Sequence, residues 1–428
     1  MLVKNTWPYR VDGELGRVEF LTDRVCQAER ILYDTARELF PPLGCWERYE
    51  TTGFKELALM CGVTEQSYAK TATWFNRLRH QEGATGATTL RASAEREGRQ
   101  VMAGLDRTTT AILHREGFDE TGQPLTPSHL WSQAAVAMAP AQVKEALEAC
   151  ELTVDERAEV DQNPVLYEQP TETVNISLDD VVVKQQKGHR TEQDGEDESV
   201  EHDGEKTGRK YVHTTVAHLQ HQEQTYCITG PGVPTVLRIL LGYLLANALV
   251  GSRLQCFVDG QKTLQAAIIR AFSWFRNVGL ILDWYHLEDK CARQLSLAMK
   301  GATLRNDALA EVSKLLWYGR VTRAIEALRN LPRANIKNPD AILGLIGYLE
   351  RNRSSLPCYA VRKRLGLRNS SNIGENMNDL LVSHRQKHKG MSWSVSGSSA
   401  LAALEALKRH DEYQQWFAYH EITLKQAA

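Results

Sequence analysis

Two short apolar runs, each followed by an acidic residue, stand out in the hydrophobic pattern of the chain. The first run, 254–258, stops at Asp259, and the second, 278–282, stops at Asp283. Between them, apolar side chains recur at helical spacing from Leu264 to Phe275, which predicts an amphipathic helix. Strand, helix and strand at this spacing predict a right-handed parallel βαβ unit. Both acids then follow the carboxyl ends of strands, where open α/β sheets bind their ligands.

The pattern on either side of this unit predicts a larger α/β domain. Alternating β-branched and polar residues indicate strands, and apolar residues three and four apart indicate helices. We expect strands over 174–185, 210–220 and 224–229, and helices over 235–249, 304–365, 372–388 and 398–409. The three strands read as a meander that precedes the βαβ unit, and 304–365 reads as a helical insertion.

The N-terminal half is predicted to be mostly helical. Residues 1–18 read as an extended arm, and an apolar stripe from Val18 to Phe40 predicts a helix. After a Gly/Thr/Ala linker over 83–89, sparse apolar positions predict a long helix that serves as a spacer or an oligomer contact. A short amphipathic helix is expected over 140–150.

Residues 53–72 resemble a helix-turn-helix. Gly62 would supply the tight turn, and Thr64 would cap the second helix. The second helix would then face the major groove of DNA. The residues expected to contact DNA from this segment are Lys55, Gln66, Ser67 and Lys70. An ordinary tight helical hairpin would give the same pattern.

These elements divide the chain into five expected segments. They are 1–82, with the helix-turn-helix-like part; 83–165, a helical spacer or oligomerisation region; 166–303, the first part of the α/β domain; 304–365, the helical insertion; and 366–428, the C-terminal part of the α/β domain.

Composition narrows the class of protein. No apolar run approaches the roughly 20 residues that span a bilayer, and the first residues lack the apolar core of a secretion signal. The 8 cysteines include no C-x-x-C pair. That argues against zinc ribbons and disulfide frameworks and fits a reducing cytoplasm. We therefore expect a cytoplasmic protein without membrane contact.

Charge is unevenly distributed along the chain. The formal net charge of −2 gives no overall attraction to nucleic acid, so any such binding must come from local patches. Residues 351–389 are rich in Lys and Arg, whereas 191–206 are acidic and nearly without large apolar side chains. The acidic segment is expected to be a mobile loop. A nucleic-acid enzyme has this asymmetry, and so do many solvated surfaces.

Three acids form a candidate metal site. Asp179 lies in the first strand of the meander, Asp259 ends a later strand, and Glu375 lies on a C-terminal helix. Phosphoryl transfer without a covalent intermediate uses two divalent cations about 3.5–4 Å apart. Mg²⁺ prefers carboxylate oxygens and keeps several waters, so three acids suffice. Taken singly, each acid also fits an ordinary turn or first-turn helix position.

The order of these elements resembles the ribonuclease-H-like fold, an α/β fold with a mixed sheet, here interrupted by an all-α insertion. At these residues the chain resembles the DDE transposases of bacterial insertion sequences, in the mutator-like superfamily. Residues 283–286 (DWYH) are similar to the family's C/D-x-x-H motif, and 374–409 are similar to its C-terminal signature with a G-M-x-W-S turn. The resemblance covers roughly 173–409 and is looser in the N-terminal half.

The resemblance implies roles for particular residues. Asp179, Asp259 and Glu375 would bind two Mg²⁺ ions, for which Mn²⁺ can substitute. Family members commonly have Asp-Gly where this chain has Asp179-Asp180. We take Asp179 as the ligand, because neighbours on a strand point to opposite faces.

The same resemblance places Asp283 and His286 beside the triad. His286 would contact the scissile phosphate or a flanking base. The alternative is a buried histidine that is bonded to Asp283, with Trp284 and Tyr285 as core residues.

The resemblance also implies partners. A transposase cuts the double-stranded ends of its element and joins the 3′-hydroxyls to target DNA, and two ends require at least a homodimer. The basic residues expected to contact the DNA backbone are Arg362, Lys363, Arg364, Arg385, Lys387 and Lys389. Two alternatives keep the same elements: a transposase-derived DNA-binding regulator without cutting activity, and a ribonuclease-H-like nuclease.

Overall fold

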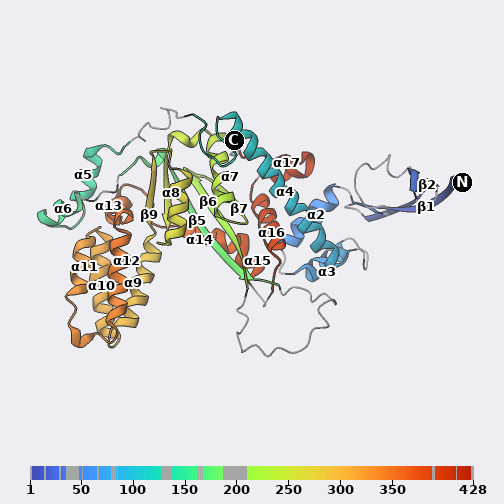
Figure 1. Ribbon diagram of the computed structural model, residues 1–428. Coiled ribbons are helices and arrows are strands. Elements are labelled where there is room, and N and C mark those ends of the chain that lie inside the picture. The colour runs from blue at the N-terminus through green and yellow to red at the C-terminus, as the bar shows by residue number, and fades with distance from the viewer. Residues whose placement is uncertain are drawn as a thin grey trace, which may run out of the picture. The chain divides into compact units, whose positions relative to one another are not determined.

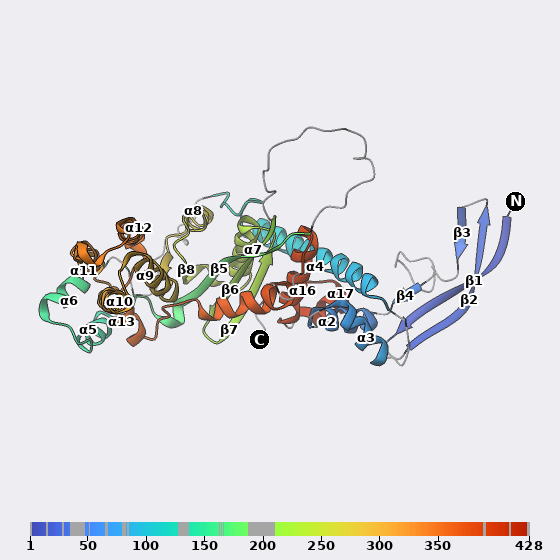
Figure 2. The same ribbon diagram turned by 90° about the horizontal axis from the view of Figure 1, so that it is seen from below.

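The computed structural model describes residues 2–13, 16–27, 30–34, 48–50, 52–64, 67–78, 83, 85–126, 137–161, 163, 165, 167–186, 210–387, 391–410 and 412–425 (Figures 1 and 2). Its contacts divide the chain into two compact units. The first unit comprises 1–104, 183–212 and 381–422, and the second comprises 105–182, 213–380 and 423–428. The acidic segment 191–206 lies outside the described residues.

A five-stranded mixed sheet forms the centre of the second unit (Figure 1). Its strands are β5 (Thr173–Lys184), β6 (Tyr211–His221), β7 (Gln224–Gly230), β8 (Arg253–Val258) and β9 (Val278–Leu282), in the spatial order β7-β6-β5-β8-β9. β6 and β7 are antiparallel, whereas β8 runs parallel to both β5 and β9. All five strands match those predicted, and the α/β class with its parallel βαβ unit is confirmed.

Helices surround this sheet and extend from it. They are α5 (Pro140–Glu148), α6 (Val154–Asp161), α7 (Val233–Ala246), α8 (Lys262–Ala271), α9 (Trp284–Ala298), α10 (Ala302–Trp317), α11 (Val321–Arg329), α12 (Pro339–Arg351), α13 (Tyr359–Arg364) and α14 (Asn372–Asn378), with a π-helical turn Asp379–Ser383 after α14. The helices α10 to α13 confirm that 304–365 is helical.

The helices α10 to α12 share one core with the sheet. α9 packs against both α10 and α12 (Figures 1 and 2). The apolar cluster beneath them joins Ile281 and Leu282 of β9 to Leu287 of α9 and to Leu345 and Leu349 of α12. The core of these helices is therefore continuous with the end of the sheet that carries Asp283.

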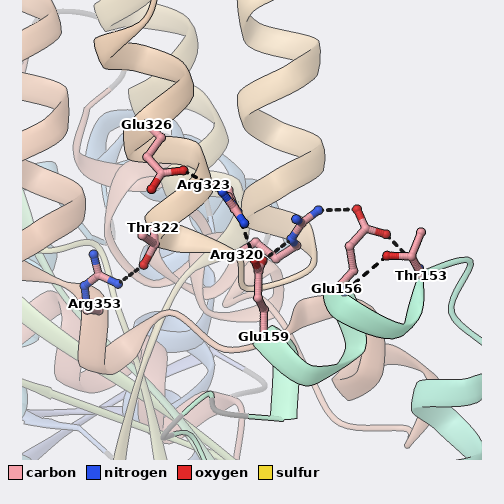
Figure 3. A network of polar contacts seen from close by, with 8 residues as sticks. All are labelled: Thr153, Glu156, Glu159, Arg320, Thr322, Arg323, Glu326 and Arg353. Atoms are coloured by element: carbon pink, nitrogen blue, oxygen red, sulfur yellow. Dashed lines mark hydrogen bonds and ion pairs between the residues drawn. The ribbon is translucent and has the colours of Figure 1, made fainter.

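A network of ion pairs attaches α6 to the start of α11 (Figure 3). The Arg320 guanidinium contacts Glu156 and donates to Glu159 Oε2 at 2.8 Å, and Arg323 Nε donates to Glu159 Oε1 at 2.9 Å. The Arg320 side chain is only 13% exposed. Hydrogen bonds from Arg320, followed by those from Arg323, lower the pKa of Glu159. Arg320 therefore bridges two acids of α6 from one partly desolvated position.

Replacing Arg320 with alanine is expected to loosen α6. The substitution removes the guanidinium from two carboxylates, and charged hydrogen bonds of this kind contribute about 1–3 kcal/mol each. Amide hydrogen exchange across 154–161 should accelerate, while exchange in α12 should not change. The exposed Arg323 is the matched control, since Arg323→Ala removes a more solvated pair and should have a smaller effect. If Arg320→Ala and Arg323→Ala accelerated exchange across 154–161 equally, Arg320 would not be the main attachment of α6.

His218 on β6 makes the second unit sensitive to acid. It is 4% exposed and its Nε2 has no hydrogen-bond partner among the described residues. Burial, together with the smaller effect of the positive charge of Arg368, lowers the pKa of His218 to about 4. The unfolded chain binds this proton near pH 6.5. The contribution of neutral His218 to the free energy of unfolding is therefore fully present above that pH, and it is lost as the pH falls toward 4.

His218→Gln is expected to weaken this acid sensitivity. A shift of this size corresponds to roughly 3 kcal/mol at about 1.36 kcal/mol per pKa unit. The difference in unfolding free energy between pH 7 and pH 4.5, measured in urea, should therefore be smaller in the variant. The difference would stay the same if protonation of His218 did not oppose folding.

The first unit contains a second sheet, which corrects one prediction. Its strands are β1 (Leu2–Gly13), β2 (Gly16–Gln27), β3 (Arg30–Asp34) and β4 (Arg48–Glu50), in the order β3-β2-β1-β4. The helix predicted over Val18–Phe40 is wrong where it is described, because 18–27 and 30–34 are strands. β1 and β2 pair as far as Gly13 and Gly16, so the hairpin turn falls between these two glycines, a signal that the stripe of apolar residues concealed.

The helices of the first unit pack closely around one another. They are α2 (Thr52–Thr64), α3 (Tyr68–Leu78), the first part of α4 (Ala87–Arg115), α15 (His384–Gln386), α16 (Val395–Lys408) and α17 (Glu412–Tyr419). Phe54 of α2 meets Phe75 of α3 edge to face, with ring centroids 5.1 Å apart. Trp416 of α17 donates to the buried Glu97 of α4 at 2.9 Å. Within the described part of the chain, no helix has the length and apolar character to cross a membrane.

Candidate functional site

One small pocket of the second unit collects the predicted acids. Asp179, Asp259, His286 and Glu375 all line it. Its other lining residues are Ser177, Leu178, Phe257, Val258, Ser371, Gly374 and Asn378. The acids come from β5, from the end of β8 and from α14, so residues almost 200 positions apart in the sequence share one site.

Strand register explains why the two aspartates are neighbours. In the parallel pair β5 and β8, Ser177 lies opposite Phe257. Asp179 and Asp259 each follow two residues later, and side chains two apart on a strand point to the same face. Asp179 thus faces the pocket, whereas Asp180 points to the other side and accepts a hydrogen bond from Thr215 on β6. Of the two aspartates, Asp179 is therefore the one that lines the pocket.

Backbone and side-chain donors hold both aspartates. Asn378 Nδ2 donates to Asp179 Oδ2 at 2.9 Å, which connects β5 to α14. Asp259 Oδ1 accepts from the backbone N–H of Gln261 at 2.8 Å. Gly260 between them has φ +91°, a conformation that favours glycine. The loop after β8 is therefore shaped to turn the Asp259 carboxylate back over the strand end.

Asp283 joins the helix of His286 to the helix of Glu375. It is 1% exposed and is the N-cap residue of α9, where its Oδ1 accepts from the N–H groups of Tyr285 (2.8 Å) and His286 (3.2 Å). Its Oδ2 accepts from the Ser371 hydroxyl at 2.6 Å and from the Ser371 N–H. Ser371 precedes α14, and its carbonyl accepts from the N–H of Glu375. In place of the alternative bond to the His286 ring, the Asp283 carboxylate accepts from backbone N–H groups and from the Ser371 hydroxyl.

The two motif aromatics between Asp283 and His286 differ in environment. Trp284 packs into the core against Trp317 and Tyr359, with ring centroids 4.8 and 4.9 Å away. Tyr285 is 55% exposed. The expectation that both rings are core residues is therefore correct for Trp284 and wrong for Tyr285, because alternate N-terminal positions of α9 face the insertion and the solvent.

His286 lies against Glu375. Its Nε2 is 3.1 Å from Glu375 Oε1, and both side chains are 37% exposed. The Oε1 atom is itself buried and accepts no well-aligned hydrogen bond from the described residues. Gly374 allows this approach, because a Cβ there would stand 2.5 Å from the Cβ of Ser177 on β5. The helix that carries Glu375 can reach the sheet only with glycine at 374.

The electrostatics of the pocket favour a cation. Shielding from water raises the pKa of Asp179, and the negative charge of Asp259 raises it further, against a backbone hydrogen bond from Asp180 that lowers it. Shielding likewise raises the pKa of Glu375, while His286 lowers it and the charges of Asp283 and Asp179 raise it. Both carboxyls would gain from a nearby positive charge.

The residue types fit a hard divalent cation, since carboxylate oxygens are its preferred ligands. Glu375 Oε1 is a buried acceptor in need of a donor or an ion. Among the described residues, however, no three His, Cys, Asp or Glu side chains already stand in a metal-binding arrangement. The acids share a pocket without converging on a common point.

The helix-turn-helix-like segment differs from its prediction in detail. α2 continues through Gly62 to Thr64, so Gly62 is helical and Thr64 ends the first helix. Ser67 holds the start of α3, with its hydroxyl accepting from the N–H of Lys70 at 3.2 Å. The Lys55 ammonium is 3.4 Å from the buried Glu97, which leaves it little freedom to reach DNA. Lys70 is exposed on α3.

The C-terminal basic residues also separate into two groups. Arg362 is 1% exposed and donates to the Arg368 carbonyl at 2.8 Å, and Arg385 is 3% exposed and stacks on Tyr68 and Trp393. The structure does not place either guanidinium on a surface that DNA can reach. Lys363, Arg364 and Lys387 are exposed. Gln66 and Lys389 lie outside the described residues.

Comparisons with known proteins add little to this geometry. No protein family matches the sequence, and no curated protein is similar to it. Among solved structures, the chain is similar to the Drosophila P element transposase strand transfer complex, with 9% sequence identity and a TM-score of 0.26, over 91% of this chain and 87% of that chain. A likeness at this TM-score carries no argument about fold or function.

Proposed function

We propose that this protein is a Mg²⁺-dependent DDE transposase with a ribonuclease-H-like catalytic domain. It would cut DNA at the ends of its own mobile element and join the freed 3′-hydroxyls to target DNA. The observation that carries the proposal is the shared pocket of Asp179, Asp259 and Glu375. The strand order β7-β6-β5-β8-β9, with the acids on β5, after β8 and on a late helix, supports the fold assignment.

In this proposal the three carboxylates hold two Mg²⁺ ions, for which Mn²⁺ can substitute. When bound, the ions lower the pKa of the attacking water or hydroxyl and stabilise the leaving oxygen. His286, whose ring lies beside Glu375, would donate a hydrogen bond to a non-bridging oxygen of the scissile phosphate. In strand transfer the 3′-oxygen of the element bonds to a target phosphorus, and the target P–O3′ bond breaks to leave a 3′-hydroxyl.

DNA binding in this proposal relies on exposed cations. Lys70, Lys363, Arg364 and Lys387 remain candidates for contacts with the phosphate backbone, which dominate affinity and make it salt-dependent. Arg362 and Arg385 are removed from this set because both are buried. The reaction on two ends requires two catalytic sites, so we propose that the active species is at least a homodimer.

A strand-transfer assay tests the proposal. Purified protein is incubated with the duplex DNA that flanks its gene, with Mg²⁺ or Mn²⁺, beside the Glu375→Gln variant and an EDTA control. Joined products from the parent protein alone are the expected result. Specific binding without joining in both proteins would indicate a DNA-binding regulator instead. Cleavage of unrelated duplexes or RNA without joining would indicate a nuclease.

A further inference from the structure

Two tyrosines of the helical insertion reach the ends of the strands that carry the site. Tyr348 of α12 donates its hydroxyl proton to the carbonyl of Asp259 at 3.0 Å. Tyr359 of α13 donates to the carbonyl of Leu282, the last residue of β9, at 2.7 Å. The insertion thus bonds to the backbone immediately at Asp259 and immediately before Asp283.

Tyr348 also shapes the turn after Asp259. A Cβ on Gly260 would lie 2.6 Å from a ring atom of Tyr348, so the ring lies directly against this glycine. The side chain is buried, and the Lys290 ammonium lies 5.6 Å from the centre of its ring. The Asp259 loop is therefore enclosed on one side by α12 rather than left to move in solvent.

Tyr359 has a more extensive set of bonds. It is fully buried, and its ring packs against Trp284, the first residue of α9. Its own carbonyl accepts from the Asn369 side chain at 2.7 Å, and the Asn369 carbonyl accepts from the N–H of Trp284 at 3.0 Å. The N–H of Asp283 donates to the carbonyl of Val258, the last residue of β8. This bond joins the end of β8 to the residue that follows β9.

We propose that Tyr348 and Tyr359 are positioning residues for catalysis, through which the helical insertion sets the spacing of Asp259 relative to the Asp283–His286 segment. This inference rests on the proposed function. The ordinary alternative is that each buried hydroxyl donates to a carbonyl only because a donor in a packed core needs an acceptor, with no effect on catalysis. The distinction matters because these two hydroxyls meet the backbone at the catalytic strand ends, where small displacements have large effects on rate.

Phenylalanine substitutions remove only the hydroxyl groups. The variants are Tyr348→Phe, Tyr359→Phe and the double variant, in the full chain. Tyr318→Phe is the matched control, because Tyr318 belongs to the same helical region and its hydroxyl donates no hydrogen bond to the residues that the structure describes. Strand-transfer rate at saturating DNA and Mg²⁺ is measured beside DNA affinity and amide hydrogen exchange at 259–261 and 283–286.

The double variant is expected to join DNA about 10- to 100-fold more slowly, with DNA affinity within about twofold of the parent. Exchange at the two strand ends should accelerate about tenfold without acceleration in α16. The control should match the parent in every readout. Parental rate and parental exchange in the double variant would overturn the proposal. If the parent protein itself joins no DNA, the proposed function fails, and hydrogen exchange still decides whether the tyrosines hold the strand ends.

Discussion

Asp259→Asn is expected to abolish strand transfer while leaving DNA binding intact. The substitution keeps the size of the side chain and its bond to the Gln261 N–H, but removes the negative charge from the centre of the pocket. A loss of at least about 10³-fold in rate corresponds to roughly 4 kcal/mol of transition-state stabilisation. The measurement is the single-turnover rate of joining with labelled element ends.

The folded state should tolerate this change. The charge of Asp259 raises the pKa of Asp179, so its removal relieves repulsion between carboxylates in the metal-free protein. We therefore expect a melting temperature equal to or above that of the parent. Asp180→Asn is the matched control, because Asp180 faces β6 and bonds to Thr215 outside the pocket. Full joining activity of Asp259→Asn, or equal loss in both variants, would contradict the assignment of the triad.

The core of the site could be predicted because local patterns determine it. Alternation along 174–185 and the apolar run 254–258 define parallel strands, and parallel strands bring the residues at their ends together. The strand pattern places Asp259 at a strand end and Asp179 within its strand, and the observed register then makes the two neighbours. The motif at 283–286 then locates His286 one helical turn beyond the next strand.

The contacts that complete the site could not be predicted in the same way. Asn378, Ser371 and Tyr348 act across 88 to 199 positions in the chain, and no periodicity encodes such a pair. Gly374 carried a weak signal, since a glycine in the first turn of a helix is unfavourable unless something approaches closely. The structure identifies that neighbour as Ser177.

The errors in the predicted helix after Val18 and in the basic segment have physical causes. The residues after Val18 fit both the helical and the alternating period, and only the glycines at 13 and 16, on either side of the hairpin turn, distinguish them. The number of Lys and Arg residues in a segment also does not reveal which of their side chains are buried. Arg362 is buried because its neighbours offer the Arg368 carbonyl, and Arg385 because Tyr68 and Trp393 provide aromatic faces.

Gly98→Leu is expected to be the most destabilising single change in the first unit. Gly98 lies in α4 where this helix meets α16, and a Cβ at this position would stand 2.3 Å from the carbonyl oxygen of Ala400. The obstacle is backbone rather than a flexible side chain, so the two helices must separate. Even Gly98→Ala should be destabilising by about 1–3 kcal/mol from overpacking, although alanine favours a helix by about 1 kcal/mol. Gly98→Leu should lower the free energy of unfolding by more than Gly98→Ala does.

The same glycine-to-alanine change at position 344 is expected to stabilise the protein. Gly344 lies within α12, and among the described residues nothing beyond the adjoining residues and backbone of its own helix lies within 4 Å of a Cβ built there. Without a steric cost, the gain in helix propensity should stabilise the protein by about 0.5–1 kcal/mol. Thermal unfolding followed by circular dichroism compares the three variants. Stability changes of opposite sign for Gly98→Ala and Gly344→Ala would show that the close approach of the Ala400 backbone, and not helix propensity, determines the effect of a substitution at position 98. A stabilising Gly98→Ala would mean that α4 and α16 do not meet at this point.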